Sequence, residues 1–243
     1  MKLLSIIIPA YNEENTLADI VETVLGVPLE LKKEIIIVDD CSTDSTFRIA
    51  EELAGKFKGI RVLKNEKNTG KGYCLRRGID EATGDIVLIQ DADLEYDPKE
   101  YPKLLGPILD GKADVVYGSR FMTTEAKRVL YFWHSVGNRM LTLFSNMICD
   151  LNLSDMETCY KVFKSRIIKS IRLKENRFGI EPEITYKLSR IKGLKIYEVG
   201  ISYHGRTYSE GKKINWKDGV RAFYVMVKML FTGLFMPKSH LKK

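Results

Sequence analysis

Asp91 and Asp93 are the residues in this sequence whose type and spacing most directly indicate chemistry. They follow the apolar run Val87-Leu88-Ile89, which is typical of a buried strand that ends at the edge of a sheet. In extended backbone, residues two apart point to the same side, so we expect both carboxylates to face one way. Oxygen ligands of this kind suit a hard divalent cation. The sequence therefore predicts a cation site with Asp91 and Asp93 as ligands.

Two further polar clusters follow two other apolar runs. Tyr11 and Glu13 come soon after Leu3–Ile8, and Asp39-Asp40 comes directly after Glu34–Val38. In open parallel sheets, ligands bind beyond the carboxyl ends of the strands. We therefore expect these clusters to join Asp91 and Asp93 in one site.

The elements that must position these clusters alternate along the first half of the chain. Apolar residues at helical spacing, such as Leu17, Ile20 and Val24, follow the first strand, and similar segments follow the next two. An order of strand, helix, strand, helix, strand, helix, strand predicts an α/β fold with a mostly parallel sheet and helices on both faces. Expected strands are 3–8, 34–38, 60–63, 87–91, 114–117 and 195–203, and a polar loop is expected at 155–161.

Size, charge and cysteine content limit the classes of protein that fit. The 243 residues, 44% of them hydrophobic, suit one domain with a core, and a net charge of +7 favours anionic partners. The cysteines lie far apart and form no Cys-x-x-Cys pair, so we expect free thiols in a reducing compartment. No long uncharged apolar segment exists, which predicts no transmembrane helix.

The C-terminal segment differs in character from the rest. Val220, Phe223 and Val227 recur at helical spacing, and a lysine-rich end follows. This pattern fits either a helix packed on the domain or an interfacial helix attracted to anionic lipid. We therefore predict a catalytic domain at 1–218 and an amphipathic helix with a basic tail at 219–243.

Three motifs together resemble a known family. They are Ile8-Pro9-Ala10-Tyr11-Asn12-Glu13, Val38-Asp39-Asp40-Cys41-Ser42-Thr43-Asp44 and Gln90-Asp91-Ala92-Asp93. In this order and spacing they resemble glycosyltransferase family 2, whose catalytic domains have the Rossmann-like GT-A fold. Gly118-Ser119-Arg120 and the segment 206–213 resemble the dolichol-phosphate mannose synthase branch, and the resemblance covers nearly all of residues 3–218.

The resemblance implies an activity and roles for individual residues. The activity is metal-dependent, inverting transfer of a hexose from a nucleotide sugar, of the GDP-mannose or UDP-glucose type, to a polyprenyl or dolichyl phosphate. Asp91 and Asp93 would hold Mg²⁺ or Mn²⁺, Arg206 and Lys213 would close on the phosphates, and Glu95 stands where related archaeal enzymes have a Gln near the metal. The donor pocket would be lined by Pro9, Tyr11, Glu13, Val38, Asp40 and Ala92, and the acceptor phosphate would be held by Arg120, Arg128 and Ser135.

The acceptor decides whether a general base is needed. A phosphate monoester is already a nucleophilic anion near pH 7, because its second pKa is roughly 6. A sugar hydroxyl needs a base within hydrogen-bond reach, and Glu157 is the candidate. The arginines and the amphipathic tail favour the polyprenyl phosphate, and the hydroxyl acceptor remains the alternative.

Other function classes fit the sequence less well. A nucleotidyltransferase would carry a Gly-rich turn after its first strand, where this chain has Pro9-Ala10-Tyr11-Asn12. A basic nucleic-acid-binding module would interleave basic and aromatic residues on one surface, whereas the basic residues here cluster late. We expect no nucleic-acid partner. We expect peripheral attachment to the cytoplasmic face of a membrane through the C-terminal helix, and the resemblance also admits a membrane partner subunit.

Overall fold

The computed structural model describes residues 2–122, 128–129, 131–207, 213, 216–233 and 239–240. The strands are β1 Leu3–Ala10, β2 Lys32–Asp39, β3 Ile60–Lys64, β4 Ile86–Ile89, β5 Val115–Ser119, β6 Lys161–Lys164, β7 Ile191–Lys192, β8 Ile196–Gly200 and β9 Ser239–His240. The helices are α1 Leu17–Gly26, α2 Thr46–Lys56, α3 Lys71–Glu81, η1 Pro98–Glu100, α4 Tyr101–Leu109, α5 Phe132–Cys149, α6 Ser165–Ile168, α7 Ile180–Ser189 and α8 Trp216–Gly233.

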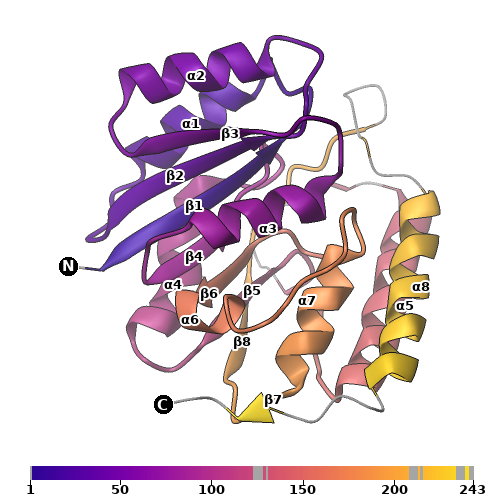
Figure 1. Ribbon diagram of the computed structural model, residues 1–243. Coiled ribbons are helices and arrows are strands. Elements are labelled where there is room, and N and C mark those ends of the chain that lie inside the picture. Colours follow the sequence, from indigo (N-terminus) through magenta and orange to yellow (C-terminus); the bar gives the residue numbers. More distant parts are fainter. Residues whose placement is uncertain are drawn as a thin grey trace.

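A seven-stranded sheet forms the centre of the molecule, in the order β3-β2-β1-β4-β6-β5-β8 (Figure 1). β1 pairs in parallel with β2 and β4, β3 with β2, and β8 with β5. β6 runs antiparallel between β4 and β5. The predicted α/β fold with a mostly parallel sheet is therefore confirmed.

Side-chain alternation along the central strands explains why helices cover both faces. Ile6 and Ile8 of β1 join a core cluster with α1, α2 and α4, whereas Ile7 joins a second cluster with α3, α6 and α7. All three isoleucines are fully buried, as expected for a parallel strand covered on both sides. The two layers hold the carboxyl ends of β1, β2 and β4 in place at one edge.

Two segments differ from the predictions. β4 ends at Ile89, so Asp91 and Asp93 lie in the turn after the strand and not in extended backbone. The expectation that they face one way for reasons of strand geometry is therefore wrong. The second difference is β6, which lies at the end of the expected polar loop. The sequence conceals this strand because it has only four residues and a lysine at each end.

α5 and α8 pack together beside α7, at the side of the molecule (Figure 1). Val225 and Met226 of α8 are buried, and Phe144 of α5 stacks on Phe223 of α8 with ring centroids 4.8 Å apart. One face of the C-terminal helix thus packs on the domain. Among the described residues, no helix is both long enough and apolar enough to cross a membrane.

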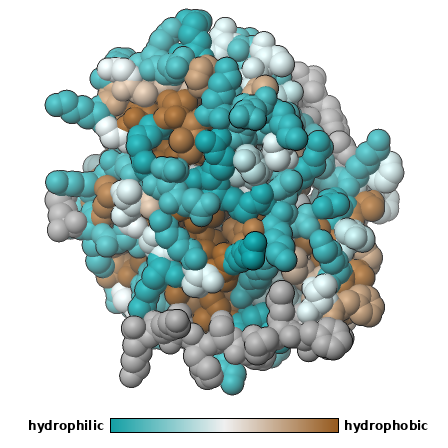
Figure 2. All heavy atoms as spheres, in the orientation of Figure 1, coloured by the Kyte–Doolittle hydropathy of each residue, from teal (hydrophilic) through white to brown (hydrophobic). Residues whose placement is uncertain are grey.

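The outer sides of these two helices remain apolar and exposed. We call this surface the α5/α8 face, and Figure 2 shows hydrophobic residues interspersed with polar ones at that edge of the molecule. Its exposed large side chains are Phe132, Trp133, Met140, Leu143 and Met147 on α5, and Trp216, Val220, Phe223, Tyr224, Leu230 and Phe231 on α8. Both predicted features of the C-terminal segment, helical form and amphipathic character, are present in α8.

Candidate active site

A cavity of about 770 Å³ opens at the carboxyl ends of β1, β2 and β4. It extends from the turn after β1 to the first turns of α5 and α8. Most of the predicted site residues line it: Pro9, Tyr11, Glu13, Asp40, Asp91, Ala92, Asp93, Glu95, Arg120, Glu157, Arg206 and Lys213. The expectation that polar clusters from separate strands meet in one site is therefore confirmed.

Three predicted residues lie outside the cavity walls. Val38 is fully buried in the core cluster under α3, because it lies within β2 and points away from the edge. Arg128 is exposed and donates a hydrogen bond to the carbonyl oxygen of Gly205 at 3.1 Å. Ser135 lies in the first turn of α5 and does not line the cavity. Of the residues expected to hold the acceptor phosphate, only Arg120 faces this space.

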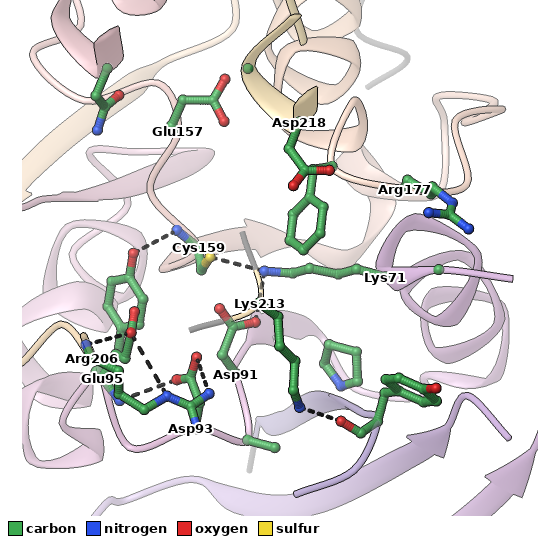
Figure 3. A pocket seen from close by; sticks show the side chains of 18 of the residues that line it. Lys71, Asp91, Asp93, Glu95, Glu157, Cys159, Arg177, Arg206, Lys213 and Asp218 are labelled. Carbon is green, nitrogen blue, oxygen red and sulfur yellow. Dashed lines mark hydrogen bonds and ion pairs between the residues drawn. The ribbon is translucent and has the colours of Figure 1, made fainter. Parts of the chain in front are cut away.

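Arg206 lies within ion-pair distance of three carboxylates on one side of the cavity (Figure 3). Its guanidinium lies 2.9 Å from Glu13 Oε1, 3.3 Å from Asp93 Oδ2 and 3.9 Å from Glu95 Oε1. Lys213 Nζ adds a second cation 2.7 Å from Glu13 Oε1. Burial acts to raise the pKa of Glu13, but the hydrogen bonds from Arg206 and Lys213 outweigh it and leave that pKa below its usual value. Arg206 and Lys213, which both follow β8 in the sequence, thus pair with these acidic residues.

Lys71, from a different element, forms the corresponding ion pair with Asp91 (Figure 3). This lysine is the first residue of α3, and its Nζ lies 2.7 Å from Asp91 Oδ1 and 2.9 Å from Cys159 Sγ. Burial works against the charged form of Asp91, but the Lys71 charge keeps the pKa of the carboxyl low. The two aspartates therefore face different cations, Lys71 for Asp91 and Arg206 for Asp93.

Asp40 holds the loop that precedes α3. Its Oδ1 accepts hydrogen bonds from Asn65 Nδ2 at 2.6 Å and the Thr69 amide at 3.0 Å, and its Oδ2 accepts from the Gly70 amide at 2.7 Å. Gly70 has φ +106°, and a Cβ there would lie 2.6 Å from the Asn176 carbonyl oxygen. Asp40 therefore positions Lys71 through this loop, in addition to its place on the cavity wall.

Arg120, which lines the cavity, forms a bidentate pair with the fully buried Asp155. Arg120 Nε and an Nη donate to the two carboxylate oxygens of Asp155 at 2.6 and 2.7 Å. The guanidinium also lies 5.2 Å from the ring centre of Tyr203. Such a bidentate contact fixes the side chain in one orientation. The charge of Arg120 is therefore largely neutralised within the protein.

Glu157 has no such partner among the side chains drawn in Figure 3. Its Oε1 is buried without a hydrogen bond, and among the described residues its carboxylate contacts no cation. Burial, together with the charge of Glu181, raises the pKa of Glu157 to about 7. Unpaired buried carboxylates are costly, so this side chain is available for a ligand.

The carboxylates also suit a divalent cation in type and charge. Burial and the charges of Asp91 and Glu95 raise the pKa of Asp93 to about 7, which reflects negative charge that the nearby cations leave uncompensated. Across the described residues, no group of three or more His, Cys, Asp or Glu forms a ready-made metal cage. Mg²⁺ in particular is usually held by one or two carboxylates and completed by substrate phosphates and water. The predicted ligands Asp91 and Asp93, with Glu95 beside them, fit that description.

Comparison with known proteins identifies the family. The model described as "Glycosyl transferase family 2" matches residues 5–172. The chain belongs to this family. The resemblance indicated by the three motifs is thereby confirmed, and the chain stands among the glycosyltransferases.

Relatives within the family carry related names. A dolichol-phosphate mannosyltransferase of Pyrococcus furiosus is 28% identical, over 87% of this chain and 60% of that protein. A dodecaprenyl-phosphate galacturonate synthase of Rhizobium johnstonii is 25% identical, over 96% of this chain and 67% of that protein. A UDP-N-acetylglucosamine–dolichyl-phosphate N-acetylglucosaminyltransferase of Methanococcus voltae is 28% identical, over 94% and 97%. The chain thus spans well under the full length of the first two.

A solved structure shows the same fold. Glucosyl-3-phosphoglycerate synthase of Mycobacterium tuberculosis, crystallised with Mn²⁺, UDP and phosphoglyceric acid, aligns with a TM-score of 0.72 at 20% identity. The alignment covers 94% of this chain and 78% of that one. The predicted GT-A architecture of this family 2 chain is therefore confirmed.

Several residues that line the cavity were not predicted from the sequence, among them Lys71, Cys159 and Asn138. Lys71 follows Asn68-Thr69-Gly70 and is the first residue of α3. A lysine at the start of a helix that follows a strand was the sequence feature that could have indicated a site residue. Nothing local to Cys159 or Asn138 indicates a site, because each reaches the cavity only through the packing of α5 and the loop before β6.

Proposed function

We propose that this chain transfers a hexose from a nucleotide sugar to a polyprenyl or dolichyl phosphate, with a divalent cation, Mg²⁺ or Mn²⁺, and with inversion at the anomeric carbon. The observation that carries the proposal is the pairing of Arg206 and Lys213 with Glu13 and Asp93 beside the Asp-x-Asp turn. These cations can exchange a carboxylate partner for a diphosphate. The names of the relatives support the acceptor class.

The reaction follows from the arrangement of the charges. The acceptor phosphate oxygen attacks C1 of the hexose, and the C1–O bond to the diphosphate breaks with its electron pair leaving on the nucleoside diphosphate. The transition state resembles an oxocarbenium ion, as in glycoside hydrolysis. A bound divalent cation would neutralise charge that grows on the leaving diphosphate. Asp91 and Asp93 would hold it, with Glu95 beside them. Arg206 and Lys213 would turn to the phosphates and exclude water.

The α5/α8 face supports peripheral attachment to a membrane. Its exposed aromatic and aliphatic side chains begin beside the cavity, because Trp133 and Trp216 line both. A helix with an apolar outer side lies in the interface plane of a bilayer. We place the protein at the cytoplasmic face, where its positive charge meets anionic lipid. The basic end of the chain, 241–243, lies outside the described residues, as do 208–212 of the segment expected to close.

A second candidate function is transfer to a sugar hydroxyl with Glu157 as general base. The raised pKa of Glu157, about 7, and its position on the cavity wall favour this alternative. A base would be essential for a hydroxyl acceptor and dispensable for a phosphate acceptor.

The two functions are separated by one assay. Purified protein is incubated with labelled UDP- and GDP-sugars, Mg²⁺ or Mn²⁺, and either a short polyprenyl phosphate or soluble sugar acceptors. We expect label in the organic phase with the lipid acceptor, and Glu157→Gln should retain that product. Product formed only with a soluble sugar, and abolished by Glu157→Gln, would replace the proposal by the alternative.

A further inference from the structure

Buried hydrogen-bond acceptors without donors mark one region of the cavity wall. Glu157 Oε1 and Asn138 Oδ1 are both buried, and neither has a hydrogen-bond partner among the described residues. Both residues line the cavity. Asn138 is connected to the same loop as Glu157, since its Nδ2 lies 3.4 Å from Asp155 Oδ1. Leaving such groups unsatisfied is unfavourable, so a ligand that donates hydrogen bonds would be favoured here.

The side chain of Lys161 holds the backbone on both sides of Glu157 in place. Lys161, fully buried, donates from Nζ to the carbonyl oxygens of Met156, at 3.1 Å, and Thr158, the residues on either side of Glu157. Its charge is matched by Glu181, whose Oε2 lies 2.5 Å away. The position of Glu157 is thus fixed by a strand residue, which is how a recognition site is kept ready for its ligand.

The cations of this wall are already paired. Lys71 contacts Asp91, Arg120 contacts Asp155, and Lys161 contacts Glu181. Arg177 also lines the cavity, but it lies away from Glu157, on the far side of Asp218 (Figure 3). Glu157 therefore adds a carboxyl group to a part of the wall whose nearby cations already have carboxylate partners. An anionic ligand group would be repelled here, whereas hydroxyl groups would supply the missing donors.

We propose that Glu157 and Asn138 bind hydroxyl groups of the donor hexose, and that this wall selects an uncharged hexose over a hexuronate. The inference rests on the proposed use of a nucleotide sugar and narrows its sugar to a charge class. It also gives Glu157 a role in the reaction with a phosphate acceptor, which needs no base. The Rhizobium relative is named for a galacturonate product, so the family offers both alternatives.

The test measures binding without acceptor, in the presence of Mn²⁺ and at pH 8, where the Glu157 carboxyl is ionised. Affinities are determined by calorimetry for two matched pairs, UDP-glucose with UDP-glucuronate and GDP-mannose with GDP-mannuronate, and for UDP and GDP alone. For the pair whose nucleotide binds, the wild type should prefer the neutral sugar by at least about tenfold. Glu157→Gln should reduce this preference by about tenfold and leave the affinity for the nucleoside diphosphate unchanged.

Two further variants sharpen the result. Asn138→Asp adds a second carboxylate and should increase the preference for the neutral sugar. Glu51→Gln makes the same chemical change as Glu157→Gln at an exposed position of α2 and should alter nothing. The inference would be overturned if the preference for the neutral sugar were the same in Glu157→Gln, Asn138→Asp and the wild type. It would also be overturned by a wild type that binds the nucleotide-hexuronate as tightly as the nucleotide-hexose, or that does not bind the nucleotide-hexose.

Failure of the inference and failure of the proposed function give different results. A wild type that discriminates between the sugars as expected but forms no lipid product contradicts the acceptor assignment and leaves the sugar site intact. Lipid product together with equal binding of hexose and hexuronate contradicts the sugar site alone.

Discussion

At the scale of single residues, the pairing of charges decides what each carboxylate of the cavity can do. Asp91 has a cation, Lys71, that comes from the start of a core helix. Glu13 and Asp93 have Arg206, which comes from the segment after β8. Glu157 has none among the described residues. Asp91 is therefore fixed by its lysine, Glu13 and Asp93 can exchange Arg206 for another charged partner, and Glu157 can bind a ligand.

Asp93 should be essential for both turnover and metal binding. We expect Asp93→Asn to lower kcat by at least about 10²-fold, the scale of losing one electrostatic contact in a transition state. It should also remove the rise in Tm that Mn²⁺ gives in the presence of nucleoside diphosphate. Asp110→Asn, at an exposed surface ion pair, serves as the control. Full activity in Asp93→Asn would contradict the metal assignment.

Glu157 should make stability depend on pH. Its pKa of about 7 in the folded state exceeds the ordinary value of 4.5, so the folded protein keeps this proton up to about pH 7 while the unfolded chain loses it near 4.5. The free energy of unfolding therefore falls as pH rises between these values, by an amount on the order of 3 kcal/mol from this group. Glu181 and Asp155 strengthen the effect, and Lys161 and Arg120 oppose it.

Urea unfolding at pH 5 and pH 8 measures this effect. Glu157→Gln should match the wild type at pH 5 and exceed its free energy of unfolding at pH 8, because the amide cannot ionise. Equal stability of the two proteins at pH 8 would show that the carboxyl ionises in the fold without cost.

At the scale of elements, the loop before α3 places Lys71 at the centre of the site. Gly70→Ala should destabilise the protein by roughly 1–3 kcal/mol, because φ +106° with extended ψ is a conformation essentially restricted to glycine. Gly55→Ala is the matched control in α2, where a Cβ meets nothing within 4 Å, and alanine should stabilise by roughly 0.5–1 kcal/mol. Chemical denaturation measures both. A Gly70→Ala protein as stable as the Gly55→Ala protein would contradict the described loop conformation.

At the scale of the whole molecule, the α5/α8 face brings an apolar surface to the mouth of a charged cavity. Phe231→Ser on α8 and Met147→Ser on α5 should each weaken binding to anionic phospholipid vesicles by about tenfold, since burying such a side chain is worth about 1.5–3 kcal/mol. Leu109→Ser is the control, because Leu109 is also exposed but lies on α4. Sedimentation with vesicles gives the bound fraction, and equal binding of all three variants would argue against this face as the contact.

The sequence by itself determined the α/β fold, the family and most of the charged residues that line the cavity. Strand periodicity is local, and polar residues at the ends of parallel strands must meet at one edge of the sheet, so Glu13, Asp40 and Asp93 were found without coordinates. The short strand β6 was not predicted, because the lysines at its two ends hide its buried character. Their charges are paired with Glu181 on α7 and with Asp114 next to β5, and both pairs exist only in the folded chain.

Only the tertiary structure decided which charges pair and which side chains remain free. Lys71 and Asp91, 20 residues apart, and Arg206 and Glu13, at opposite ends of the chain, come together through packing that no local pattern encodes. The same packing removed Val38, Arg128 and Ser135 from the predicted site and left Glu157 without a partner. Electrostatic pairing depends on distance in space and on burial, and both are properties of the folded chain.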